Sequence, residues 1–173
     1  MGRPFSSWRP ELRCPGVRAV PWHALRAEGV EAAVFDLDNT LCPWGAGELP
    51  PDAVALLAEL GRLGLARGVL TNSRLRGRRA AIEGALGALG VALEFNAGKP
   101  GKRGYIRLLG ALGVAPGPRV VAVGDQWWTD VIGAKRMGLR AVLVPPLDPA
   151  SEPAWARWRR RSERWILGPG EAG

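Results

Sequence analysis

Short apolar runs alternate with amphipathic stretches along most of the chain. The runs are rich in Val, Leu and Ala, as in strands that are buried on both faces of a parallel sheet. They predict strands at residues 31–36, 66–71, 91–95, 119–124 and 139–144. Between these runs, apolar residues recur at the three- and four-residue spacing of helices. This spacing predicts helices at residues 52–63, 74–89, 102–112 and 129–137.

The alternation of strands and helices predicts the fold class. Strands joined by helices of this length form right-handed crossovers and a mainly parallel sheet. We therefore predict an α/β fold with a doubly wound, five-stranded sheet. A chain of 173 residues is long enough for one full core, and it contains no repeat of solenoid length.

The two ends of the chain differ from its centre. Residues 1–30 are rich in Pro and Arg, and we interpret them as an N-terminal arm that docks onto the domain at 31–150. Residues 151–173 predict a basic amphipathic helix and tail, with Trp and Arg residues on opposite sides of a helical projection. Such a helix could lie in an anionic membrane interface or pack on its own domain, and the sequence leaves both open. The two sides are formed by Trp155, Trp158, Trp165 and Ile166, and by Arg157, Arg160, Arg161 and Arg164.

The net charge of +8, carried largely by arginine, indicates the kind of partner that the protein could bind. Such a surface attracts polyanions, which include nucleic acid, anionic membranes and phosphorylated substrates. A biased genome would also favour Arg, so the composition alone does not decide. Cys14 and Cys42 are too few for a disulfide framework, and no run approaches the roughly 20 apolar residues of a spanning helix. We expect a cytoplasmic protein whose membrane contact, if any, is peripheral and at the inner face.

Polar residues follow several of the predicted strands at the point where each strand ends. The carboxyl ends of parallel strands meet at one edge of the sheet, so these residues should form one site. They are Asp36, Asp38 and Thr40 after the first strand, Thr71, Asn72 and Ser73 after the second, Asp125 and Asp130 after the fourth, and Lys99 with Pro100 before the third helix.

Three of these side chains predict a metal ion. The carboxylates of Asp36, Asp38 and Asp125 repel one another unless a cation joins them. A small set of hard oxygen ligands suits Mg²⁺, which takes further ligands from water and from a substrate phosphate. The sequence therefore predicts a magnesium site that binds a phosphorylated substrate.

The remaining residue types fit the hydrolysis of a phosphate ester. Asp36 can act as a covalent nucleophile, and Asp38 as the acid that protonates the leaving oxygen and then the base that activates water. Thr71 and the amides of Asn72 and Ser73 can bind phosphoryl oxygens, and Lys99 offers a positive charge. We therefore predict a Mg²⁺-dependent phosphomonoester hydrolase.

Together these motifs resemble the four ordered motifs of the haloacid dehalogenase-like (HAD) phosphatases, subfamily IIIA, which have a Rossmann-like fold. The resemblance implies that Asp36 is the nucleophile and that Asp38 is the acid/base and lends its backbone carbonyl to the metal. It makes Asp125 the remaining protein ligand and Asp130 a supporting carboxylate that positions Lys99 or a metal-bound water. Many relatives have Ser where this chain has Thr71, and the hydroxyl is kept.

A narrower resemblance suggests a substrate. The runs at 124–139 and 158–167 resemble the YqeG-like branch, which is similar to phosphatidylglycerophosphate phosphatases. The resemblance implies that the chain dephosphorylates this anionic lipid in phosphatidylglycerol synthesis.

The lengths of the connections predict an open site. Residues 41–65 and 74–98 leave no room for a substantial cap domain, and an uncapped site suits a phosphate on a large or surface-held substrate. Nucleic-acid ends and phosphoproteins therefore stay open as alternative substrates. A non-catalytic, basic RNA- or ribosome-binding module is the alternative of a different class, and the oligomeric state is not indicated.

Overall fold

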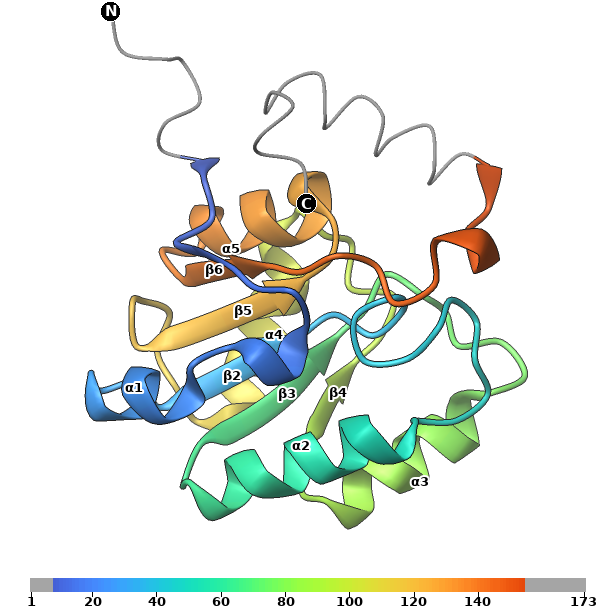
Figure 1. The fold of residues 1–173 in the computed structure, drawn as a ribbon, viewed down its shortest axis with the longest axis horizontal. Coiled ribbons are helices and arrows are strands. Elements are labelled where there is room, and N and C mark those ends of the chain that lie inside the picture. The colour runs from blue at the N-terminus through green and yellow to red at the C-terminus, as the bar shows by residue number, and fades with distance from the viewer. Residues whose placement is uncertain (1–7, 155–173) are drawn as a thin grey trace, which may run out of the picture.

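A six-stranded parallel sheet forms the centre of the protein, whose computed structural model describes residues 8–154 (Figure 1). The strand order is β1-β6-β5-β2-β3-β4, with all neighbouring strands parallel. The predicted α/β, doubly wound fold is therefore confirmed. The strands are β1 (Leu12–Arg13), β2 (Ala32–Phe35), β3 (Ala66–Leu70), β4 (Ala92–Glu94), β5 (Val120–Gly124) and β6 (Arg140–Leu143).

The sixth strand is a correction to the predicted five. Within the N-terminal arm, Leu12 and Arg13 form β1, which pairs with the edge of β6. The amide of Cys14 donates to the carbonyl of Leu143 at 3.1 Å and extends this pairing. An uncovered edge strand exposes unpaired backbone groups, and the arm satisfies those of β6. A strand of two residues is too short to produce an alternating sequence pattern, so it could not be predicted from the sequence.

Helices cover both faces of the sheet (Figure 1). On one face, α1 (Trp22–Ala27), α2 (Pro51–Arg62) and α3 (Arg79–Ala88) pack on side chains such as Ala33 and Phe35. On the other, α4 (Lys102–Leu112) and α5 (Ile132–Arg136) pack on Ala32 and Val34. Successive residues of β2 thus point to opposite faces, as the strand geometry requires.

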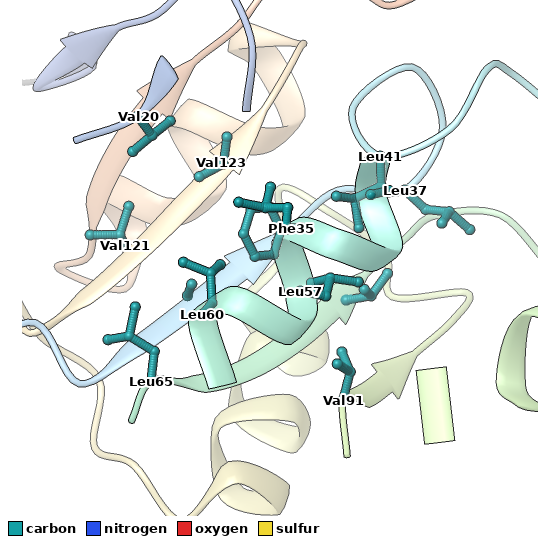
Figure 2. Packing of buried hydrophobic residues seen from close by; sticks show 14 of the residues in the cluster. Val20, Phe35, Leu37, Leu41, Leu57, Leu60, Leu65, Val91, Val121 and Val123 are labelled. Atoms are coloured by element: carbon teal, nitrogen blue, oxygen red, sulfur yellow. The ribbon is translucent and has the colours of Figure 1, made fainter. Parts of the chain in front are cut away.

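The first face carries the larger cluster of buried residues, and Figure 2 shows its centre. Phe35 of β2 lies beside Leu57 and Leu60 of α2, and all three are fully buried. The arm contributes Trp22, and the centroid of its ring lies 5.6 Å from the centroid of the Phe35 ring. The arm is therefore part of the core on this face.

Two of the predicted helices differ from the observed ones in where they begin or in their type. The helix predicted at 74–89 begins only at Arg79, because Leu75 and Gly77 adopt left-handed backbone conformations with φ of 52° and 73°. Residues 74–78 form a loop instead. The helix predicted at 129–137 consists of a π-helical segment, η3 (Trp127–Val131), followed by α5.

The connections also agree with the prediction of an uncapped domain. Within residues 8–154, the segment between β2 and β3 contains α2, the segment between β3 and β4 contains α3, and neither forms a separate cap. In the same part of the chain, none of the helices has the length and apolar character needed to cross a bilayer. The predicted C-terminal amphipathic helix, within residues 151–173, lies almost entirely outside the described residues, which end at residue 154. At its expected start, Pro149–Ser151 form a short 3₁₀ helix, η4.

The packing of the arm predicts its contribution to stability. Replacing Trp22 with Ala removes a buried ring, and we expect the free energy of unfolding to fall by about 3–5 kcal/mol. The neighbouring His23 has a side chain that is 77% exposed, so His23→Ala should change stability by less than about 0.5 kcal/mol. Urea unfolding measures both variants. A loss below about 1 kcal/mol in Trp22→Ala would mean that the arm is not part of the core.

Candidate active site

Two aspartates lie at the carboxyl ends of adjacent central strands. Asp36 follows β2 and Asp125 follows β5, and these strands pair so that Phe35 lies opposite Val123. The amide of Asp36 donates to the carbonyl of Val123 at 2.9 Å, which continues the pairing to the edge. The connections leave the β2–β5 pair toward opposite sides of the sheet, so this is the switch point where ligands bind in such folds.

Lys99 joins two of the carboxylates. Its Nζ donates to Oδ1 of Asp36 at 2.6 Å and to Oδ1 of Asp130 at 2.7 Å. The lysine side chain is only 3% exposed. The other oxygen of Asp130 accepts from the amide of Gln126 at 3.0 Å, which fixes this carboxylate. Asp130 therefore holds the ammonium group beside Asp36.

The burial of these groups shifts their protonation. Burial raises the pKa of Asp36 well above its ordinary value; the charge of Lys99 opposes this rise, and the charges of Asp130 and Asp125 add to it. Burial by itself would lower the pKa of Lys99, but the neighbouring carboxylates of Asp130 and Asp36 outweigh it and raise that pKa. The lysine is therefore held in its charged form. Ionising Asp36 beside Asp125 and Asp130 would add negative charge that this one lysine does not balance.

Three carboxylates have the donor set of a metal site. One oxygen each of Asp36, Asp125 and Asp130 lies within 4.8 Å of the others. Oxygen ligands from carboxylates suit hard divalent cations such as Mg²⁺, and a cation would balance the remaining negative charge. Asp125 also accepts a hydrogen bond from Oγ1 of Thr40 at 3.4 Å. The side chains present thus fit a divalent metal, with the Asp130 carboxylate in the group and the Asp38 carboxylate outside it.

A glycine makes room for Asp130. A Cβ on Gly124 would lie 2.3 Å from Cγ of Asp130, far inside van der Waals contact. The first residues of η3 turn back toward the end of β5, with the amide of Asp130 donating to the carbonyl of Gln126 at 2.9 Å. Gly124 therefore allows the carboxylate of Asp130 to pack against the strand end and reach Lys99.

Asn72 supports Lys99 from the second strand. Its side-chain amide donates to the carbonyl of Lys99 at 3.0 Å and accepts from the amide of Lys99 at 2.7 Å. The Lys99–Pro100 peptide bond is cis. The side chain of Asn72 therefore positions Lys99, and the phosphate contact predicted for Asn72 stays a prediction. Thr71 is buried beside them, and its Oγ1 accepts from the amide of Ser73 at 3.1 Å, which leaves the hydroxyl hydrogen available as a donor.

Asp38 lies in the same cleft but has a different partner. Nη2 of Arg78 contacts its two carboxylate oxygens at 2.6 and 2.8 Å, and the amide of Gly45 donates to Oδ1 at 2.9 Å. The cleft has a volume of about 770 Å³. Its walls include Asp36, Asp38, Thr71, Asn72, Ser73 and Lys99. The other predicted site residues do not line the cleft directly; they are Thr40, Pro100, Asp125 and Asp130.

Several residues at or near the site were not predicted from the sequence. Arg78 lies inside a predicted helix, although the alternation of arginines at 74, 76 and 78 beside a phosphate motif was an available signal.

Asn39 is fully buried, and it links the loop after β2 to the C-terminal side of the domain. Its Nδ2 donates to Oε1 of Glu152 at 2.9 Å and its Oδ1 accepts from the amide of Asp148 at 3.2 Å. Glu152 carries no local signal of this contact.

Comparison with known proteins relates the chain to hydrolases and phosphatases. The model of the haloacid dehalogenase-like hydrolase family matches residues 43–138. Phosphatidylglycerophosphate phosphatase 1, chloroplastic, of Chlamydomonas reinhardtii is 34% identical over 91% of this chain and 60% of its own length. The protein named probable phosphatase YqeG of Bacillus subtilis is 29% identical over 83% of this chain and 80% of its own length. The predicted resemblance to the YqeG-like branch is confirmed by these two relatives.

A solved structure supports the fold. A HAD-superfamily hydrolase from Ehrlichia chaffeensis superimposes with a TM-score of 0.56, covering 78% of this chain and 95% of that one. The two sequences are 13% identical, so the likeness concerns the fold alone. Because the chain spans 60% of the length of the algal relative, the activity of that whole protein is not transferred by the comparison.

The raised pKa of Asp36 predicts a pH-dependent stability in the absence of metal. A carboxyl group whose pKa is higher in the folded than in the unfolded protein binds more protons when folded. The free energy of unfolding should therefore fall as the pH rises from about 4 toward the raised pKa, by at most about 1.4 kcal/mol per pH unit. Mg²⁺ favours the ionised carboxylate and should reduce this fall.

Urea unfolding in EDTA and in Mg²⁺ between about pH 4 and pH 8 measures the effect. Asp36→Asn removes the titrating group, so the difference between the two proteins isolates its contribution. Parallel stability curves for the wild type and Asp36→Asn in EDTA would contradict the assignment of the raised pKa to Asp36.

Proposed function

The chain belongs to the haloacid dehalogenase-like hydrolases, and from this premise we propose that it is a Mg²⁺-dependent phosphatase with a phosphorylated Asp36 intermediate. The observation that supports this most is the contact of Lys99 Nζ with Asp36 Oδ1 at 2.6 Å, between two residues that line the cleft. An ammonium group there faces the position of a phosphate that is attacked by Asp36, and it is charged at neutral pH.

In the first step, an oxygen of Asp36 attacks phosphorus and forms an acyl phosphate, while the bond from phosphorus to the ester oxygen breaks. The leaving oxygen takes a proton from Asp38 and departs as an alcohol. Thr71 can donate its hydroxyl hydrogen to a phosphoryl oxygen, and Lys99 balances the charge that develops. The side-chain amide of Asn72 keeps Lys99 in place through both of its backbone groups.

In the second step, Asp38 accepts a proton from a water molecule as the water oxygen attacks phosphorus. The bond between phosphorus and Asp36 breaks, phosphate is released and the carboxylate is regenerated. Asp38 has then regained its proton, so one cycle leaves the protein unchanged.

The proposed metal would be held by Asp36, Asp125 and, following the family, the backbone carbonyl of Asp38. Asp130 lies close enough to contribute directly or through water, since its carboxylate belongs to the same cluster. When bound, Mg²⁺ would neutralise phosphate charge and align the phosphorus for in-line attack.

For the substrate we propose phosphatidylglycerophosphate. Two relatives that each match 91% of this chain are named for this substrate. The site has no separate cap in residues 8–154, which suits a phosphate on a lipid that stays in a membrane. Peripheral contact with an anionic membrane belongs to the same proposal, because the chain has a net charge of +8.

Loss of the nucleophile should abolish turnover. Hydrolysis of p-nitrophenyl phosphate should require Mg²⁺, and Asp36→Asn should lower kcat at least about 1000-fold. Asp52→Asn, an exposed acidic residue at the start of α2, is the matched control and should keep wild-type activity. Equal activity in Asp36→Asn and the wild type would rule out Asp36 as nucleophile, and the absence of turnover in the wild type would favour a binding module.

Phosphate release from phosphatidylglycerophosphate in mixed micelles, beside a 3′-phosphorylated oligonucleotide and a phosphopeptide, tests the substrate. We expect the lipid to have the highest kcat/KM. If the oligonucleotide or the phosphopeptide reacts and the lipid does not, the lipid proposal is wrong while the phosphatase chemistry stands.

A further inference from the structure

The cleft contains more positive charge than the proposed chemistry uses. Its lining includes Arg74, Arg76 and Arg78 in addition to Lys99, against the two carboxylates of Asp36 and Asp38. A phosphate attacked by Asp36 is already served by Lys99, Thr71 and the proposed metal. Arg78 is paired with Asp38, the proposed acid/base, whereas Arg74 and Arg76 have no part in that chemistry.

The arginines belong to one loop, residues 73–78, which is fixed at several points. Leu75 is 1% exposed and packs in the core, and its amide donates to Oγ of Ser73 at 3.1 Å. Arg78 is held by the carbonyl of Ala46 at 2.8 Å and by Asp38. The loop is thus anchored on both sides of Arg76, although it has no regular secondary structure.

The backbone of the loop is strained at its buried residue. Leu75 has φ of 52°, a left-handed conformation that is unfavourable for a residue with a Cβ. This conformation buries the leucine while the residues on either side, Arg74 and Arg76, stay exposed and line the cleft. Strain of this kind persists where the surrounding structure imposes it, and it is concentrated at binding sites.

Neither Arg74 nor Arg76 forms an ion pair or a hydrogen bond with another residue in the range 8–154. Two exposed guanidinium groups at one cleft wall repel each other and are stabilised by an anion. Guanidinium groups bind phosphate oxygens in a bidentate manner, and a fixed loop reduces the entropy lost on binding.

The position of Arg78 places this loop on the side of the leaving group. Asp38 protonates the leaving oxygen in the proposed mechanism, so the part of the substrate beyond that oxygen lies beside Asp38. Arg78 contacts Asp38 at 2.6 Å, and Arg74 and Arg76 belong to the same loop and cleft. An anionic group beyond the leaving oxygen would therefore meet these arginines.

From these observations we propose that Arg74 and Arg76, next to Arg78, form a subsite for a second phosphate or phosphodiester carried by the substrate beyond its leaving oxygen. The inference rests on the proposed function, because it takes the leaving-group side from the role of Asp38. It defines the substrate class as phosphomonoesters with a second phosphate group in the same molecule, and the second group is bound but not hydrolysed.

Two water-soluble probes separate the second phosphate from a membrane surface. Glycerol 3-phosphate has one phosphate, and glycerophosphoglycerol phosphate has the same terminal phosphate and an added phosphodiester. Calorimetric titration of the full-length Asp36→Asn protein in Mg²⁺ measures binding without turnover. We expect the second probe to bind at least about tenfold more tightly, as one additional charge-assisted contact would give.

The variant Arg74→Gln/Arg76→Gln, made in the Asp36→Asn protein, should reduce this ratio to about one. The matched control Arg62→Gln/Arg103→Gln removes the same charge from two exposed arginines that do not line the cleft, and it should keep the ratio. The same comparison of kcat/KM in otherwise wild-type protein should give the same loss of preference.

Three results would overturn the subsite. The two probes could bind equally to the starting protein, or the arginine variant could weaken both probes by the same factor, which would assign the arginines to the attacked phosphate. Phosphatidylglycerol vesicles could bind in an Arg74- and Arg76-dependent manner without any preference between the soluble probes, which would assign them to a membrane surface. Turnover of p-nitrophenyl phosphate tests the proposed function separately, so the two failures are distinguishable.

Discussion

The buried ammonium group of Lys99 is the interaction on which the rest of the site depends. It contacts Asp36 and Asp130 at 2.6 and 2.7 Å in a position that is almost closed to solvent. A buried charge is tolerated only when it is paired and hydrogen-bonded, so each neighbouring element supplies a partner. Asp36 comes from the end of β2 and Asp130 from η3, and the side chain of Asn72 bonds the backbone of Lys99. Gly124 leaves the space that Asp130 occupies.

The sequence predicts the parts of this arrangement that depend on strand ends. Buried strands produce continuous apolar runs, and the parallel topology brings their carboxyl ends to one edge. Asp36 and Asp125 could therefore be assigned to neighbouring positions from the sequence alone. The helix α4 was predicted at residues 102–112, its observed bounds, from its amphipathic pattern. Gly113, which follows it, adopts the left-handed conformation typical of a helix end.

The parts that the sequence does not predict depend on contacts between distant segments. Leu75 fits a helical pattern, and only the tertiary structure, in which it is buried in a left-handed conformation, turns residues 74–78 into a cleft wall. The contact of Asn39 with Glu152 spans 113 positions and has no local signature. The strand β1 has two residues and forms because β6 offers an edge. Loop conformations and polar contacts between distant segments therefore could not be predicted from the sequence of this protein.

The cleft thus combines the proposed nucleophile, Asp36, with arginines on a separate wall. In the proposed mechanism, Asp36 carries the phosphoryl group between the two steps. Acid quenching during turnover of p-nitrophenyl phosphate, followed by mass spectrometry of the peptides, measures this directly. We expect one added phosphoryl group on Asp36 in the presence of Mg²⁺, and none in EDTA. Turnover with no phosphorylated Asp36, or with the phosphoryl group on another residue, would contradict it.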